Sequence, residues 1–129
     1  MYTLSNELRA TAEPSQRISL VAQITRQVYK PLVLEFELLR TAHAVAPELG
    51  DLAREIEMRR RQNQVRLIAY LHEQGALRHG LSLEEATDVL WVLTSYDLYR
   101  MLVVERGWEP VRYETWLAQL LIHHLLASH

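Results

Sequence analysis

Helix-breaking residues are few in this chain and stand far apart, which favours long helices over any other architecture. The 129 residues include only four Gly and four Pro. Between them, apolar side chains recur at the three- and four-residue intervals of one face of an α-helix. No run of β-branched or aromatic residues alternates with polar ones between turn signals, as a half-buried strand would. We therefore predict an all-α helical bundle of about six helices, forming one domain over 1–129.

Local signals predict where most helices begin and end. Ser15 has the side chain of an N-cap residue. Pro31 removes a backbone donor, so the helix before it should end or kink there. Either Pro47 or Asp51 opens the third long helix, and Gly75 closes it. These signals predict helices over residues 4–12, 15–29, 32–43, 47–74, 82–106 and 110–127.

The clearest local signal lies in the sequence SLEE at 82–85. The Ser82 hydroxyl can accept a hydrogen bond from the backbone N–H of Glu85, whose carboxylate can reach back towards the start of the helix. The helix that follows has a possible break near Ser95 and Tyr96, and Gly107 should end it.

The last two predicted helices carry apolar residues on more than one face. An α-helix turns by about 100° per residue, so Trp91 and Leu93 point to nearly opposite sides. A surface helix needs only one apolar stripe. We therefore expect one side to pack inwards and the other to pack against a second copy in a four-helix seam, while a fully buried central helix in a monomer is the alternative. The predicted seam residues are Val89, Leu93, Tyr96, Tyr113, Leu117, Leu120, Leu121 and His124.

Several runs in the second half of the chain together resemble the C-terminal half of TetR-family transcriptional regulators. They are LHEQGALR (71–78), GLS (80–82), EA (85–86), LWVLTS (90–95), LYR (98–100), VVERGW (103–108) and YETWL (113–117). The first half is similar only in its helix spacing. The resemblance implies an all-helical domain that binds a small-molecule effector and dimerises through its last two helices.

The same family carries an N-terminal helix-turn-helix that binds operator DNA. No recognition-helix pattern of the type Thr-Tyr/Leu-Tyr-Xaa-His/Tyr-Phe precedes Ser15. We therefore expect operator DNA to be a partner only through a helix-turn-helix domain that this chain lacks.

An effector pocket would lie between the middle helices, with apolar and aromatic walls and a few polar anchors. On the third long helix, Arg60 and Asn63 fall on an otherwise apolar stripe. A buried guanidinium must reach solvent or meet an acid or an anionic ligand, and a stripe that drifts until both residues reach solvent is the other possibility. The predicted ligand-binding residues are Tyr29, Phe36, Leu39, Arg60, Asn63, Tyr70, Trp91 and Thr94, with ordinary core packing as the alternative for each.

Composition excludes several classes of protein. The absence of Cys excludes disulfide scaffolds, thiol catalysis and Cys-based metal sites. A net charge of −2 argues against a chain that holds nucleic acid by its own positive field. The longest uncharged apolar run, 89–96, is far shorter than the ~20 residues that span a bilayer, and no secretory signal opens the chain. We expect a cytoplasmic protein with no membrane partner.

Signals of catalysis and of metal binding are missing. The sequence has neither a Gly-rich phosphate loop nor a Gly-Xaa-Ser-Xaa-Gly turn, so we predict no enzyme, no catalytic residue and no cofactor. His123 and His124 diverge by about 100° on a helix, and no carboxylate accompanies them at ligand spacing, so we predict no metal site. We expect His43, on an apolar stripe, to be a core histidine.

Two functional hypotheses follow. The first is the effector-binding and dimerisation domain of a TetR-like transcriptional regulator, a repressor, which senses a small and largely apolar or aromatic molecule. The alternative is a stand-alone helical dimerisation protein that pairs with a full-length regulator.

Overall fold

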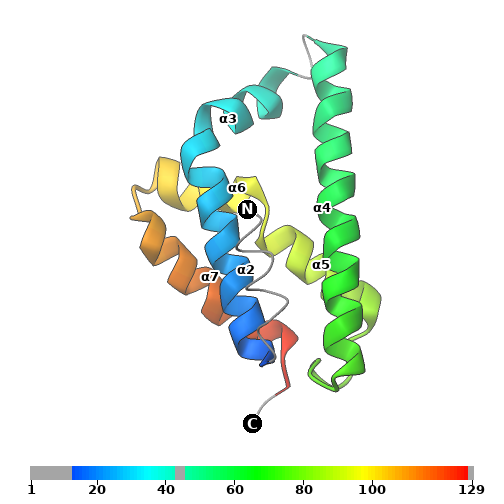
Figure 1. The fold of residues 1–129 in the computed structure, drawn as a ribbon. Helices are drawn as coiled ribbons and strands as arrows, with labels where there is room; N and C mark the ends of the chain where they lie inside the picture. Colours follow the sequence, from blue (N-terminus) through cyan, green and yellow to red (C-terminus); the bar gives the residue numbers. More distant parts are fainter. Residues whose placement is uncertain (1–12, 43–45, 128–129) are drawn as a thin grey trace.

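The computed structural model describes residues 13–42 and 46–127, and this part of the chain is α-helical (Figure 1). The α-helices of ten or more residues are α2 (Pro14–Tyr29), α3 (Val33–Ala42), α4 (Pro47–Glu73), α5 (Leu83–Leu93) and α7 (Pro110–Leu125). The shorter elements are the 3₁₀-helix η1 (Lys30–Leu32), α6 (Tyr96–Tyr99) and the π-helix η2 (Arg100–Glu105). The all-α prediction is confirmed over these residues. The predicted helix at 4–12 and the predicted core residue His43 lie outside them.

Prolines set the starts and interruptions of the first helices. Pro14 stands in the first turn of α2 and Glu13 is its N-cap, so the prediction that Ser15 caps this helix is wrong. The Ser15 hydroxyl instead donates a hydrogen bond to Glu13 Oε1 at 3.1 Å. The interruption at Pro31 is confirmed, because α2 ends at Tyr29 and η1 leads into α3. Pro47, rather than Asp51, begins α4.

The predicted cap of α5 is confirmed, and so is the break that follows this helix. Ser82 Oγ accepts a hydrogen bond from the Glu85 backbone N–H at 3.0 Å. The chain leaves the helix at Thr94 and re-enters one at Tyr96. Gly107, with φ of 74°, ends the segment in the left-handed conformation that favours glycine.

The C-terminal helix ends two residues earlier than predicted because its last residues pair with another segment. Leu126 is extended and forms an isolated antiparallel bridge with Leu77. The Arg78 N–H donates to the Leu125 carbonyl and the Ala127 N–H donates to the Ala76 carbonyl, each at 2.9 Å. These bonds fasten the connection between α4 and α5 to the end of α7.

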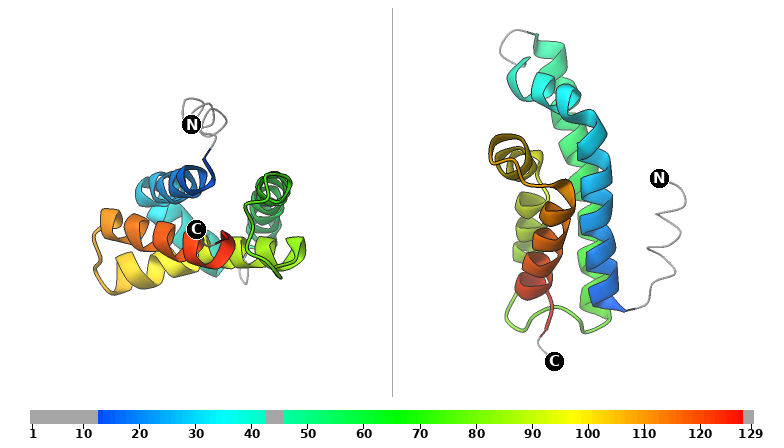
Figure 2. Two further views of the ribbon diagram at one scale, coloured as in Figure 1. Left: turned by 90° about the horizontal axis from the view of Figure 1, so that it is seen from below. Right: turned by 90° about the vertical axis from the view of Figure 1, so that its left-hand side faces the viewer.

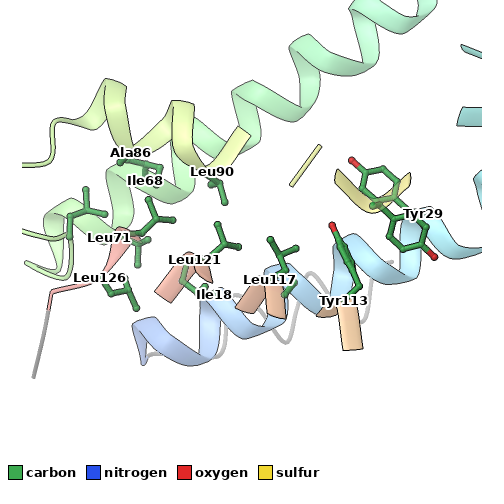
Figure 3. Close-up of a cluster of buried hydrophobic side chains, with 14 of the residues drawn as sticks. Ile18, Tyr29, Ile68, Leu71, Ala86, Leu90, Tyr113, Leu117, Leu121 and Leu126 are labelled. Carbon is green, nitrogen blue, oxygen red and sulfur yellow. The ribbon is translucent and has the colours of Figure 1, made fainter. Parts of the chain in front are cut away.

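The helices form two layers, with α2 and α4 on one side and α5, α6 and α7 on the other (Figure 2). Between the layers, α7 buries the residues Tyr113, Leu117, Leu121 and Leu125, which recur every four positions. α7 packs mainly on α2, whose Ile18 is fully buried. Figure 3 shows Leu117 and Leu121 beside Ile18, and Leu71 and Leu90 in the same cluster.

This packing corrects half of the predicted dimer seam. Tyr113, Leu117 and Leu121 have no exposed surface, because the protomer itself covers that face of α7. Tyr96 is also buried: its ring stacks on Phe36 with centroids 5.1 Å apart, and its hydroxyl donates to Glu37 Oε1 at 2.7 Å. The prediction that these four residues face outwards is therefore wrong.

Within the residues that the structure describes, no helix has both the length and the apolar character needed to cross a membrane.

Candidate functional site

A cavity of about 320 Å³ lies between α2 and α4, and we call it the α2–α4 cavity. Val21, Ile24 and Val28 line it from α2, Phe36 lines it from α3, and Ile56 lines it from α4. The three α2 residues follow one another at intervals of three and four, so they share one face of that helix. The walls are therefore apolar and come from three helices.

The polar floor of the α2–α4 cavity is built around Thr94, the C-cap residue of α5. Thr94 Oγ1 accepts hydrogen bonds from Arg60 Nη1 at 2.7 Å and from Gln64 Nε2 at 2.9 Å. The Thr94 carbonyl accepts a hydrogen bond from the Tyr29 hydroxyl at 2.7 Å. A C-cap carbonyl lacks a partner within its own helix, which leaves it free for a side chain of another element. Thr94 thus joins α2, α4 and α5.

Arg60 was expected either to reach solvent or to meet an acid or an anionic ligand. In the structure it meets an acid, because its guanidinium pairs with the carboxylate of Glu57, one turn earlier on α4. Its Nε and Nη2 donate to the two carboxylate oxygens of Glu57 at 3.2 and 3.0 Å. Nη2 also donates to the Trp91 carbonyl at 3.0 Å. The Arg60 side chain is only 19% exposed, so this paired and hydrogen-bonded geometry is what allows a guanidinium to stay there.

Tyr29 combines a hydrogen bond with an aromatic cluster at one end of the α2–α4 cavity. Its ring lies 5.0 Å from that of Phe36, 5.4 Å from that of Tyr96 and 5.5 Å from that of Tyr99. Burial raises the pKa of Tyr29 to about 12. The hydroxyl therefore stays protonated at neutral pH and keeps donating to the Thr94 carbonyl.

A second, smaller cavity of about 250 Å³ adjoins the first, between α3, α4 and the start of α6; we call it the α3–α4 cavity. Phe36, Ile56 and Glu57 line both spaces. Leu39 and Asp97 line only the α3–α4 cavity. A molecule longer than the α2–α4 cavity could therefore extend past Phe36.

The structure gathers most of the predicted ligand residues but leaves two apart. Those lining the α2–α4 cavity are Tyr29, Phe36, Arg60, Asn63 and Thr94, and Leu39 lines the adjoining one. Tyr70 and Trp91 line neither cavity. The Arg17 guanidinium lies 4.0 Å from the centroid of the Tyr70 ring, and the Trp91 ring lies 5.7 Å from the guanidinium of Arg61 and of Arg60.

Gln64 lines the α2–α4 cavity but was not among the predicted ligand-binding residues, which included its neighbour Asn63 instead. Asn63 is exposed and accepts a hydrogen bond from Arg66 at 3.1 Å, whereas Gln64 is 9% exposed. The buried row of α4 includes Gln64, Ile68 and Leu71, at intervals of four and three. Tracing this stripe back from Leu71 through Ile68 would have found Gln64.

An apolar groove of about 370 Å³ follows the outer side of α5 and α7, and we call it the α5–α7 groove. It is lined by Asp88, Val89, Val92, Leu93 and His124. Three of these residues were predicted for the dimer seam, and Val92 is 51% exposed. Leu120, another predicted seam residue, is half-buried. An apolar surface therefore remains on these helices after the buried residues are set aside.

In the described part of the chain, no cluster of three or more His, Asp or Glu side chains could hold a metal ion. His123 and His124 are exposed, and their rings meet edge to face with centroids 5.1 Å apart.

In the comparisons with known proteins, no family model, no curated protein and no solved structure matched this chain.

Proposed function

We propose that this chain is the effector-binding and dimerisation domain of a TetR-like transcriptional regulator. The α2–α4 cavity is the observation that carries the proposal, because apolar walls around a few polar groups characterise small-molecule sites. Its volume of about 320 Å³ lies at the small end of the ~300–1,000 Å³ that such sites occupy. The TetR-like sequence runs of the second half of the chain are the other support. The expected effector is small and largely apolar or aromatic.

The position of the cavity suggests how an effector would act. A molecule between α2 and α4 would sit on the hydrogen bonds that join both helices to Thr94. Changing the spacing of those helices would, in a whole regulator, alter the separation of two DNA readers from the roughly 34–36 Å between successive major-groove sites. Effector and operator would then weaken each other's binding by the same factor.

The α5–α7 groove supports the dimerisation half of the proposal. A second copy related by two-fold symmetry would cover the same apolar residues on each protomer. Burying a side chain such as Leu93 or Val92 contributes ~1.5–3 kcal/mol, so several such residues per protomer could offset the free-energy cost of association.

Sedimentation equilibrium at micromolar concentration tests the dimer. We expect the unmodified chain to be dimeric and Leu93→Glu to be monomeric, because a carboxylate would be buried without a partner. Leu38→Glu is the matched control: Leu38 is 57% exposed on α3, away from the groove, so this variant should remain dimeric. A folded, monomeric unmodified chain would contradict this half of the proposal.

Binding of small aromatic fragments tests the effector cavity. Ile24→Trp should fill the α2–α4 cavity and remove the thermal stabilisation that a bound naphthalene fragment gives. Leu34→Trp, on an 81% exposed position of α3, should leave that stabilisation unchanged. Equal stabilisation of both variants would place the fragment elsewhere and contradict the proposal.

A stand-alone dimerisation protein is the second candidate, and the same exposed groove favours it. Such a protein would form mixed dimers with a full-length regulator that carries a matching face. Gel filtration of the two chains together tests this, since a mixed dimer supports the second candidate and separate homodimers oppose it.

A further inference from the structure

We infer that the α2–α4 cavity takes an uncharged molecule that has an apolar body and donates at least one hydrogen bond, and that it disfavours anions. This inference rests on the proposed function and names the class of effector. It follows from the hydrogen-bonding capacity that remains in the cavity once every internal bond has been assigned.

Among the described residues that line the cavity, Arg60 is the one cation, and it is already paired with a carboxylate. Arg60 has five N–H groups, and two of them bond the Glu57 carboxylate, one bonds Thr94 Oγ1 and one bonds the Trp91 carbonyl. An anionic ligand would have to displace Glu57 from Arg60 or lie against that carboxylate. Both arrangements place like charges close together in a partly buried site, so they disfavour an anion.

The Thr94 hydroxyl determines which way the Gln64 amide faces. A hydroxyl has one proton, and that of Thr94 is donated to the Leu90 carbonyl at 2.6 Å. Thr94 Oγ1 must therefore accept the two remaining bonds, one from Arg60 and one from Gln64 Nε2. The amide nitrogen of Gln64 points towards Thr94, and the amide oxygen points away from it.

That amide oxygen has no hydrogen-bond partner. Gln64 lines the α2–α4 cavity, the residue is only 9% exposed, and its Oε1 is shielded from water. A buried acceptor without a partner is costly, and most such atoms in proteins bond water, a ligand or another group. A donor that enters the cavity, with a small rotation of the Gln64 side chain, would satisfy this oxygen.

Other polar groups of the lining also have acceptors to spare. The Tyr29 hydroxyl donates its proton to the Thr94 carbonyl, and the Thr25 hydroxyl donates its proton to the Val21 carbonyl at 2.7 Å, so each oxygen can only accept a further bond. The spare donors among the described lining residues are one N–H of Arg60, the second N–H of the Gln64 amide and the amide of Asn63 at the exposed rim. The buried polar atom of this lining that has no partner at all is an acceptor, Gln64 Oε1, so the lining favours a ligand that donates.

Three probes with one skeleton test the inference: 1-naphthol, 1-methoxynaphthalene and 1-naphthoate, each measured by equilibrium dialysis at neutral pH. The first donates a hydrogen bond, the second cannot donate, and the third is an anion. We expect 1-naphthol to bind about 5- to 10-fold more tightly than 1-methoxynaphthalene, the ratio for one hydrogen bond to a neutral group, and 1-naphthoate to bind most weakly.

Gln64→Leu identifies the acceptor, since leucine is similar in size and has no amide. This variant should lose the preference for 1-naphthol over 1-methoxynaphthalene. Gln62→Leu, the same substitution at an exposed position of α4, should keep it. Circular dichroism and thermal unfolding establish that both variants fold, and the comparison of probes on the unmodified chain stands without them.

The outcomes separate this inference from the proposed function. Equal binding of 1-naphthol and 1-methoxynaphthalene, tightest binding of 1-naphthoate, or a preference that survives in Gln64→Leu would overturn the effector class and leave the cavity as a binding site. Failure of all three probes to bind would overturn the effector cavity together with its class.

Discussion

Thr94 satisfies hydrogen bonds from three elements at once. Its hydroxyl donates within α5 and accepts from two side chains of α4, and its carbonyl accepts from Tyr29 of α2. Because the residue is 3% exposed, water cannot replace any of these bonds. Both walls of the cavity are therefore joined to one residue, the α4 wall through the Thr94 side chain and the α2 wall through the Thr94 backbone carbonyl.

Thr94→Val tests this dependence. Valine has nearly the same shape, but it leaves N–H groups of Arg60 and Gln64 without an acceptor. We expect a loss of about 2–3 kcal/mol in the free energy of unfolding, measured by urea denaturation. Thr115→Val is the matched control, because Thr115 is exposed and its hydroxyl bonds only the carbonyl four residues earlier; it should change stability by less than about 0.5 kcal/mol. Equal losses would contradict the role of Thr94.

The buried tyrosines predict a loss of stability at alkaline pH. Burial raises the pKa of Tyr29 from 10.0 to about 12, and it also raises the pKa of Tyr99 and Tyr113. Between about pH 10 and pH 12 the unfolded chain loses phenolic protons that the native chain retains. Since the native state then binds more protons, the free energy of unfolding should fall as pH rises through this range.

Urea unfolding at a series of pH values, with tyrosinate absorbance as the second signal, measures this effect. Tyr29→Phe should make the decline shallower, since one of the shifted groups is gone. A free energy of unfolding that stays constant, or rises, over the same range would contradict the prediction.

At the scale of elements, the break between α5 and α6 decides which apolar residues face inwards. A continuous helix from 82 to 106 would keep Tyr96 in register with Val89 and Leu93, and the predicted seam placed these three residues together although a break near Ser95 and Tyr96 was also expected. The chain instead leaves the helix at Thr94 and re-enters it at Tyr96, so the faces before and after the break are no longer aligned. Tyr96 turns into the protomer, while the other two stay beside the α5–α7 groove.

Ser82→Ala tests the start of α5. The alanine variant leaves the Glu85 N–H without its capping oxygen, so we expect a loss of about 1 kcal/mol in the free energy of unfolding. Ser15→Ala is the matched control, because Ser15 does not cap α2 and bonds only the exposed Glu13 side chain. Thermal or urea unfolding of the two variants should separate them, and an equal loss in both would count against the cap.

For the whole molecule, the two layers are joined at one end by backbone pairing and along their length by the core. The segment around Leu126 pairs with the connection between α4 and α5, and Leu126 itself is 6% exposed. At the other end, η1 and α3 lead the chain from the end of α2 towards the start of α4 (Figure 1). The α2–α4 cavity lies between these two ends, in the space between α2 and α4.

Leu126→Ala tests the importance of the paired end. The substitution removes a buried side chain from the junction of α4, α5 and α7, so we expect a loss of about 2–5 kcal/mol in the free energy of unfolding. Val111→Ala on the 65% exposed outer side of α7 should have little effect. A small loss for Leu126→Ala would indicate that this end frays without cost.

Several features followed from the sequence because they depend on residues close together in the chain. An interruption at Pro31, a cap at Ser82 and a stop at Gly107 each involve atoms within about one helical turn. Thr94 and Tyr29 were predicted for one site because a pocket was expected between the middle helices, and both line the α2–α4 cavity. Which of Asn63 and Gln64 faces inwards depends on a helix rotation that only the packing of α4 specifies.

The sequence by itself determined the helical class, the positions of the breaks and the excess of apolar surface on the last helices, since hydrogen bonds and side-chain spacing along one helix are local. Only the tertiary structure decided that α2 covers the row from Tyr113 to Leu125, that Arg60 is held against Thr94 and Trp91 as well as Glu57, and that a cavity remains between α2 and α4. Periodicity states how many faces a helix must bury, but the partner of each face is chosen by contacts between residues far apart in the chain.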